Sequence, residues 1–194
     1  EPVINAPDHV LVRVRCAAIN HIDLYVLGGL PKAKYDFPHV MGSDAAGVVE
    51  RVGSGVTAVK PGDRVLLNPG ISCGRCEVCR AGEQPLCRSY RILGEHREGT
   101  IAEYLVVPEA NLARIAAEWS WPEAAGFTLA TMTSWRMLDS RSRLRAGETV
   151  LIWGIGGGVG LASVQIAKQL GARVVAHAAS PQAEPGFFFG VAAR

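Results

Sequence analysis

The first part of the chain shows the short-period pattern of β-strands. Residues 10–19, VLVRVRCAAI, alternate apolar and polar positions, which predicts a half-buried strand. Residues 40–69 read as further short strands joined by glycine turns, with a tight reversal at Lys60-Pro61-Gly62-Asp63. Residues 99–115 return to strand character after a cysteine-rich interruption. These patterns predict a mostly β region.

The pattern changes near residue 119. Residues 122–143 combine apolar residues with good helix formers, and Pro122 is acceptable in a first turn, so one or two helices are expected. The apolar run 149–153, a glycine-dense turn, the helical run 160–170 and the apolar run 172–178 predict a β-α-β unit. We therefore place one domain at 1–121 and part of a second at 122–194.

The two ends of the chain lead to further expectations. The chain starts at Glu1 and enters its first strand within about eight residues, so we expect upstream sequence to be missing. The tail 181–194 departs from what precedes it, because Pro181, Pro185 and Gly186 forbid a regular helix and three phenylalanines follow together.

Composition excludes several functional classes. With 48% hydrophobic and 20% charged residues, the 194-residue chain is ordinary for a soluble globular protein. A net charge of +2 leaves no basic surplus for nucleic acid or a membrane surface. No apolar run approaches the roughly 18 residues that span a bilayer, and the amino end lacks a secretion pattern. We expect no nucleic-acid or membrane partner and a cytoplasmic location.

Four cysteines lie within the run CGRCEVCRAGEQPLC: Cys73, Cys76, Cys79 and Cys87. This spacing suits one tetrahedral zinc ion, and four thiolates close its coordination sphere, so the site would be structural and would hold a lobe at 72–88. Two disulfides and a bacterial iron–sulfur cluster are the alternatives, but the cluster expects a three-residue gap followed by Cys-Pro, which is absent here. Cys16 is expected to be a buried strand residue.

The turn WGIGGGVG predicts a phosphate-binding site. It places Gly154, Gly157 and Gly160 three apart between a strand and a helix, with Gly156, Gly158 and Val159 among them. Glycines let the backbone approach a pyrophosphate, and the N–H groups and dipole of the following helix stabilise its charge. An ordinary tight turn is the alternative, but the order strand, turn, helix and strand favours dinucleotide binding.

The end of the second strand bears on the choice of cofactor. An NAD-preferring site would place Asp or Glu there, whereas this chain has His177, Ala178, Ala179 and Ser180. NADP is therefore favoured and NAD stays possible, although no Arg or Lys that would grip a 2′-phosphate precedes the tail. We count Ser180 with the glycine turn among the cofactor-binding candidates.

Together these features resemble the medium-chain dehydrogenase/reductase superfamily over about residues 9–180. The marks are GSDAAGVVERVGSGV, KPGDRV, the four cysteines, GTIAEYLVVP and the glycine turn. The resemblance implies an α+β then α/β fold: a GroES-like, β-rich catalytic domain with a structural zinc lobe, then the first part of a Rossmann domain. It also implies an NAD(P)-dependent oxidoreductase with a small-molecule substrate, in a family whose intact members often form homo-oligomers.

Alcohol dehydrogenases of this superfamily hold a catalytic zinc with a Cys-His-x-Asp motif, a His-Glu pair after a glycine, and a later Cys. The corresponding positions here are Asn20, the pair Ser43-Asp44, and Leu129. Only Asp44 is a good zinc ligand, and a catalytic zinc ordinarily needs three. Asn20 with Asp23 is similar to the Asn-x-x-Asp of zinc-independent quinone oxidoreductases. The resemblance implies that the structural zinc is kept and the catalytic zinc lost.

The mechanism expected from this resemblance is hydride transfer from the nicotinamide to an enone, quinone or carbonyl. Without a Lewis acid, hydrogen-bond donors must stabilise the developing negative charge, and Asn20, His21 and Tyr25 are candidates. His21 or Tyr25 would supply the proton, with Asp23 orienting that group. Thr133 matches the family threonine that lies against the nicotinamide, unless it merely satisfies helix backbone.

Two alternatives stay open. The first is a zinc-dependent alcohol dehydrogenase with a rebuilt metal site, in which His21, His39 and His96 would join Asp44, although histidine is as readily a hydrogen-bonded structural residue. The second is a truncated, non-catalytic zinc-binding fragment that binds cofactor weakly or not at all, because only the first strands of a dinucleotide-binding sheet are present in the sequence.

Overall fold

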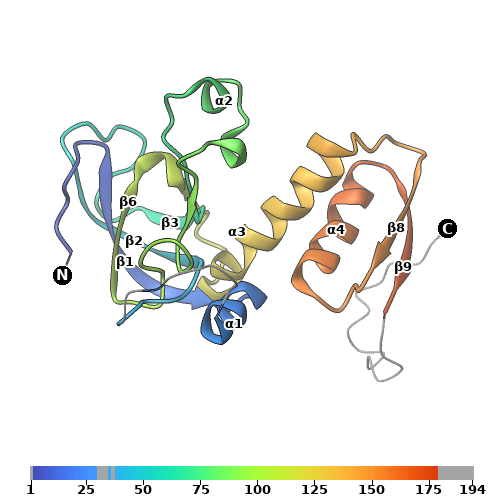
Figure 1. The fold of residues 1–194 in the computed structure, drawn as a ribbon, viewed down its shortest axis with the longest axis horizontal. Coiled ribbons are helices and arrows are strands. Elements are labelled where there is room, and N and C mark those ends of the chain that lie inside the picture. Colours follow the sequence, from blue (N-terminus) through green and yellow to red (C-terminus); the bar gives the residue numbers. More distant parts are fainter. Residues whose placement is uncertain (1, 30–34, 36–37, 179–194) are drawn as a thin grey trace. The chain divides into compact units, whose positions relative to one another are not determined.

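The computed structural model describes residues 2–29, 35 and 38–178. Contacts divide the chain into two compact units, Glu1–Leu129 and Ala130–Arg194. The division falls within a single long helix, α3 (Trp121–Trp135), so this helix contributes residues to both units (Figure 1). The domain boundary at 121/122 that the sequence suggests stays a prediction.

The first unit is β-rich, as the sequence predicted. In the part of the chain that the structure describes, its regular elements are β1 (His9–Ala18), α1 (His21–Gly28), β2 (Asp44–Val52), β3 (Arg64–Leu67), β4 (Gly70–Ile71), α2 (Glu77–Arg80), a 3-10 helix (Gln84–Leu86), β5 (Arg91–Ile92), β6 (Tyr104–Pro108), a second 3-10 helix (Glu109–Asn111) and β7 (Leu112–Arg114).

A five-stranded antiparallel sheet forms the body of this unit, in the order β6-β1-β2-β3-β7. Val10 and Val12 of β1 pack in one core with Val49, Val65 and Val107 from three other strands. β-Branched side chains suit such a pleated, buried surface. The strand predicted at 10–19 is confirmed at His9–Ala18. β4 and β5 form a separate two-stranded sheet beside the cysteine lobe.

The beginning of α3 is fixed to the first unit by small and aromatic side chains. Ala124 and Ala125 are 0% exposed and pack with Ala46 of β2. The Arg64 guanidinium lies 4.2 Å from the centre of the Trp121 ring and donates a hydrogen bond to the carbonyl oxygen of Trp119 at 2.6 Å. These contacts place the N-terminal half of the helix against the sheet.

The second unit contains the β-α-β arrangement that the sequence predicted. After α3 come a π-helix (Arg136–Arg141), β8 (Thr149–Trp153), α4 (Gly158–Gln169) and β9 (Arg173–His177). β8 and β9 pair in parallel, and Ile152 packs with Val164, Ile166 and Ala167 of α4. Parallel strands require a crossover connection, and α4 provides it (Figure 1).

Within the residues that the structure describes, we find no helix with the length and apolar character needed to cross a membrane.

Candidate functional site

A polar cluster forms where α1 begins. Asn20 and Asp23 form a capping box, in which the Asp23 carboxylate accepts a hydrogen bond from Asn20 N at 2.7 Å. The other Asp23 oxygen accepts a hydrogen bond from Gly42 N at 3.1 Å. Asp23 is 3% exposed. One buried side chain therefore fixes both the start of α1 and the segment that leads into β2.

Asp44 supplies a second buried carboxyl group to this cluster. It is the first residue of β2 and is 1% exposed. Its Oδ2 accepts a hydrogen bond from Asn20 Nδ2 at 3.0 Å, and its Oδ1 accepts one from Leu129 N at 3.0 Å. Asn20 and Leu129 stand where the resemblance places two zinc ligands of alcohol dehydrogenases. Here the Asp44 carboxyl group joins these two positions.

The environment of Asp44 changes its acidity. Burial raises its pKa from 3.8 to about 6, and the negative charge of Asp23 acts in the same direction, while the hydrogen bonds from Asn20 and Leu129 oppose the rise. The carboxyl group is therefore largely ionised at neutral pH and becomes protonated in mildly acidic solution.

Gly42 makes the close approach of these segments possible. Its φ of 97° lies in the left-handed region, and a Cβ atom there would be 2.6 Å from both Ile101 Cγ1 and Thr100 Oγ1. Its N–H reaches Asp23, and its carbonyl oxygen accepts a hydrogen bond from Thr100 N at 2.9 Å. A side chain at this position would push the segment before β2 away from Thr100 and Ile101.

The structure brings Asn20 and Asp23 together and places the other predicted catalytic residues on exposed surfaces. Asn20 is half-buried, His21 is exposed, and Tyr25 is 58% exposed on α1. Thr133 is exposed on α3 in the second unit. The hydrogen bonds of Asp23 go to backbone N–H groups, which differs from the expected role of orienting His21 or Tyr25. The catalytic assignments stay predictions.

The residues considered for a rebuilt metal site do not gather. His39 Nε2 lies 2.9 Å from the Gly94 carbonyl oxygen, and His96 Nδ1 lies 3.3 Å from Ile92 N. Ser43 is fully buried and donates a hydrogen bond to the Leu93 carbonyl oxygen at 2.8 Å. In the described part of the chain, the one group of three or more histidine, cysteine or acidic side chains able to share a metal ion is the cysteine cluster.

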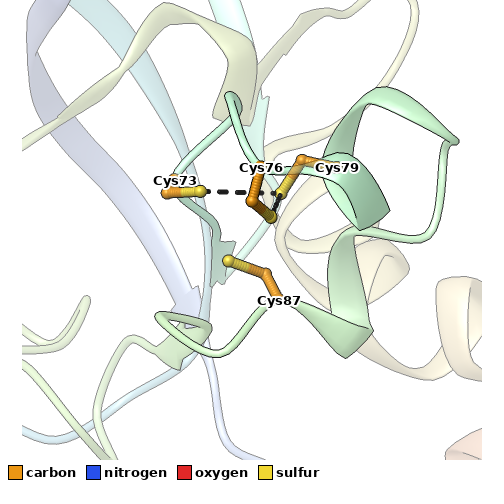
Figure 2. A group of neighbouring side chains, drawn as sticks. All are labelled: Cys73, Cys76, Cys79 and Cys87. Carbon is orange, nitrogen blue, oxygen red and sulfur yellow. Dashed lines mark hydrogen bonds between the residues drawn. The ribbon is translucent and has the colours of Figure 1, made fainter.

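Figure 2 shows the four cysteines converging on one point from the loop after β4, from α2 and from the segment after the first 3-10 helix. Their sulfur atoms all lie within 4.8 Å of one another, and Cys79 Sγ is 3.4 Å from Cys76 Sγ and 3.9 Å from Cys73 Sγ. Zn–S bonds of about 2.3 Å in a tetrahedron put the sulfurs about 3.8 Å apart. The geometry therefore fits zinc, and none of these cysteines forms a disulfide.

Backbone donors favour the metal-binding form of the Cys73 thiol. The N–H groups of Arg75 and then Cys76 lower the pKa of Cys73 to about 6. The thiolate is the form of cysteine that binds metal ions. Four protein sulfurs leave no position for water or substrate, so this site is suited to holding the lobe together and not to chemistry.

The glycine turn between β8 and α4 has the geometry expected of a phosphate cradle. Gly154 N and Ile155 N both donate hydrogen bonds to the His177 carbonyl oxygen, at 2.9 and 3.2 Å, which ties the turn to the end of β9. Gly160 is buried, and a Cβ atom on this residue would lie 2.5 Å from the Gly154 carbonyl oxygen. The helix can therefore begin close beneath the turn.

The backbone at the start of α4 offers donors for an anion. Leu161 N makes the first helical hydrogen bond, to Gly157 O at 2.9 Å. The N–H groups of Gly158, Val159 and Gly160 precede it and point from the helix N-terminus, where the helix dipole also favours negative charge. Gly156 is an exposed residue of the same turn. This arrangement can receive a pyrophosphate.

The end of β9 carries an aromatic pair. The rings of Trp153 and His177 stack with centroids 4.0 Å apart. Ala178 is the last residue described, so the predicted contribution of Ser180 and the tail 181–194 lie outside the described residues. The choice between NAD and NADP rests on the sequence of this strand end.

Comparison with known proteins identifies the family. The profile of the alcohol dehydrogenase GroES-like domain matches residues 6–117. The chain is 39% identical over 171 residues to acryloyl-coenzyme A reductase of Metallosphaera sedula, covering 88% of this chain and 51% of the relative. The chain therefore belongs to the alcohol dehydrogenase GroES-like family, within the medium-chain dehydrogenase/reductase superfamily.

Solved structures agree with this assignment. A crystal structure of an NAD-dependent alcohol dehydrogenase superposes with a TM-score of 0.85 at 50% identity, over 93% of this chain and 53% of the other. A cobalt- and zinc-bound thermostable alcohol dehydrogenase from Pyrobaculum aerophilum superposes with a TM-score of 0.78 at 39% identity, over 88% and 51%. The chain spans about half the length of these proteins. Both of these proteins are named as alcohol dehydrogenases.

From the sequence, Leu129 was recognised only as the position of an absent zinc ligand and not as a hydrogen-bond donor. Leu129 contributes its backbone N–H, which no side-chain pattern reveals. Asp44 appeared in the sequence as an isolated metal-ligand type, and its link to Asn20 was not anticipated. The one available signal was an acidic residue immediately before the apolar strand AAGVV, where burial is expected.

Proposed function

We propose that the chain belongs to an NAD(P)H-dependent reductase that transfers hydride to an activated C=C or C=O group without a catalytic zinc, and that the cysteine lobe holds one structural zinc. The observation that carries this proposal is the Asp44 carboxyl group, whose two oxygens accept hydrogen bonds from Asn20 and from Leu129 N–H. A carboxylate already bound to two donors, beside an amide and a leucine, is a hydrogen-bonding site and not a three-ligand metal site.

For this hydride transfer, the protein must place hydrogen-bond and proton donors next to the acceptor. When bound, the nicotinamide would supply a hydride, that is, two electrons and one hydrogen, to the electron-poor carbon of the acceptor. Negative charge then develops on the acceptor oxygen, and the Asn20 amide is suited to donating a hydrogen bond to it. A proton from His21 or Tyr25 completes the saturated product, and both groups are exposed and accessible.

Cofactor binding is assigned to the second unit. The N–H groups of the turn at Gly154–Gly160 and of the start of α4 would receive the pyrophosphate. Thr133 would lie against the nicotinamide. NADP is the preferred cofactor in this proposal because the strand end at His177-Ala178 has no carboxylate to repel a 2′-phosphate.

A conjugated carbonyl compound is the acceptor class we favour. The named activity of the Metallosphaera sedula relative, acryloyl-coenzyme A reduction, is hydride addition to such a C=C bond, and that protein is 39% identical to this chain over 171 residues. In this reaction the negative charge appears on the thioester oxygen as an enolate, which requires the kind of donor that Asn20 offers.

The test is NADPH oxidation with acryloyl-coenzyme A, an enone and a quinone, compared with alcohol oxidation by NADP⁺. We expect reduction of at least one activated acceptor, with kcat lowered about 100-fold in Asn20→Ala because one donor to the developing charge is lost. A matched control is Asn5→Ala, which removes an exposed amide that bonds the half-buried His9 ring. Absence of turnover with every acceptor would contradict the proposal.

A zinc-dependent alcohol dehydrogenase is the second candidate, because two superposing structures carry that activity in their names and one is described as cobalt- and zinc-bound. Metal analysis of the purified chain separates the two functions. The reductase proposal expects about one zinc per chain, held by the four cysteines. About two zinc ions per chain, with the second lost in Asp44→Asn, would favour the alcohol dehydrogenase.

A further inference from the structure

The Asp44 carboxyl group is anchored by rigid surroundings. Its backbone lies in the β1–β2 pairing opposite Ala18, and its carbonyl oxygen accepts a hydrogen bond from Thr100 Oγ1 at 3.0 Å. Its side chain is buried and meets Leu129 N at 3.0 Å. The backbone and the carboxyl group of Asp44 are thus both held in place. A side chain that donates a hydrogen bond to this carboxyl group must therefore lie in one direction from it.

Asn20 is that partner. Its backbone N–H is held by Asp23 at 2.7 Å, and its side-chain Nδ2 is 3.0 Å from Asp44 Oδ2. A carboxamide is planar and carries two N–H donors on one nitrogen. Fixing one N–H against Asp44 therefore fixes the plane of the amide and the direction of the second N–H.

Charge, and not shape alone, is needed at position 44. An asparagine there would keep one oxygen for the Leu129 N–H, but it would turn its own NH₂ group toward the NH₂ group of Asn20. Two donors cannot bond to each other, whereas an ionised carboxylate accepts on both oxygens. Asp44 thus selects one of the two orientations in which the Asn20 amide could lie.

We propose that Asp44 is a positioning residue, which holds the Asn20 amide so that its second N–H points at the substrate oxygen where negative charge develops. This inference rests on the proposed function, in which Asn20 donates to that oxygen. Asp44 is buried, and Asn20 is the side chain through which it would act on the substrate. Donors that are already oriented stabilise the transition state without reorganisation, and loss of an orienting partner typically lowers activity about 10- to 100-fold.

Three variants of the 194-residue chain test the inference. Asp44→Asn removes the acceptor for the Asn20 N–H, so that a bond between the two side chains requires the Asn20 amide to flip, and it keeps an acceptor for Leu129. The exchanged pair Asn20→Asp with Asp44→Asn restores a hydrogen bond between the two positions but leaves no donor at position 20. Ser43→Ala is the matched control, because Ser43 is an equally buried neighbour whose hydroxyl bonds Leu93 O and not Asn20.

The first readout needs no turnover. In the unaltered chain, NMR should show slow hydrogen exchange at the Asn20 side-chain amide and at Leu129 N–H. Asp44→Asn should accelerate exchange at the Asn20 amide by about 10- to 100-fold, since a hydrogen bond to a charged acceptor is lost, and Ser43→Ala should not. Fast exchange of the Asn20 amide in the unaltered chain would overturn the inference even if Asp44→Asn failed to fold.

The second readout separates positioning from simple support of the fold. Asp44→Asn should lower kcat about 10- to 100-fold with little change in KM. The exchanged pair should recover the melting temperature toward that of the unaltered chain but not recover kcat. Recovery of both would show that the link is merely structural and would overturn the inference. If no acceptor is reduced at all, the proposed function fails, while the amide exchange still decides whether Asp44 orients Asn20.

Discussion

Asp23 and Asp44 place two buried carboxyl groups in one polar cluster, each bonded to donors from other segments of the chain. Burying a carboxylate is costly unless hydrogen bonds replace its lost water. At Asp44 the replacement is incomplete, because burial raises the pKa to about 6 in spite of the donors. The residue is therefore kept ionised near neutral pH at some cost to the stability of the fold.

The raised pKa of Asp44 predicts that the free energy of unfolding depends on pH. Because the pKa of Asp44 is raised from 3.8 to about 6 on folding, the folded protein binds this proton more tightly than the unfolded chain. The free energy of unfolding should therefore fall as pH rises from about 4 to about 6, by at most about 3 kcal/mol from this residue. Asp44→Asn should lack this part of the dependence. Urea unfolding of both proteins from pH 4 to 7 checks it, and parallel curves would contradict it.

Gly42 offers a test of the backbone beside the cluster. Its φ of 97° and the 2.6 Å approach that a Cβ atom would make to Ile101 and Thr100 predict that Gly42→Ala lowers the free energy of unfolding by about 1–3 kcal/mol. Gly126 is a solvent-exposed residue in the middle of α3 with open space around it. Gly126→Ala should therefore stabilise the protein by about 0.5–1 kcal/mol. Equal effects in thermal unfolding would contradict this account.

Among the elements, the turn between β8 and α4 depends on close contact between backbone atoms. Gly160→Ala would place a methyl group 2.5 Å from the Gly154 carbonyl oxygen and must displace the start of the helix. We expect weaker NADPH binding and a loss of about 1–3 kcal/mol in unfolding free energy. Gln165→Ala, on the exposed side of the same helix, should change neither. Fluorescence titration with NADPH and thermal unfolding measure the two effects.

At the scale of the whole chain, the division into two compact units predicts separable responses to metal removal. The four cysteines belong to the first unit, and their lobe has short helices and few buried apolar residues, so its order should depend on zinc. Chelation, or Cys79→Ser, should accelerate amide exchange in α2 and the following 3-10 helix. Exchange in β8, α4 and β9 should stay unchanged, because their core contains residues of the second unit only.

A Cys16→Ser variant is the control for the thiol chemistry, since Cys16 lies in β1 outside the cluster. Amide exchange that is identical with and without metal throughout α2 would contradict a structural role for zinc. Acceleration of exchange in both units would contradict their independence.

The features that sequence spacing indicates correctly are local ones. Cysteines separated by two residues converge because a short turn brings them together, and TVLIW matches β8 residue for residue because an apolar run bounded by turn residues has few alternatives. The glycine turn is equally local, since strand, turn and helix follow one another along the chain. For these elements, chemistry and conformation are encoded in the same few residues.

The polar cluster was decided by tertiary structure. Asp44 meets Asn20 across 24 positions and Leu129 across 85. The resemblance to zinc dehydrogenases places these three positions at one site, but nothing in the sequence shows that they bond to one another, and one is a leucine with no polar side chain. Only packing of α1, β2 and α3 brings a carboxyl group, an amide and a backbone N–H to within 3.0 Å, because hydrogen bonds between distant segments depend on how their elements pack and not on any local pattern.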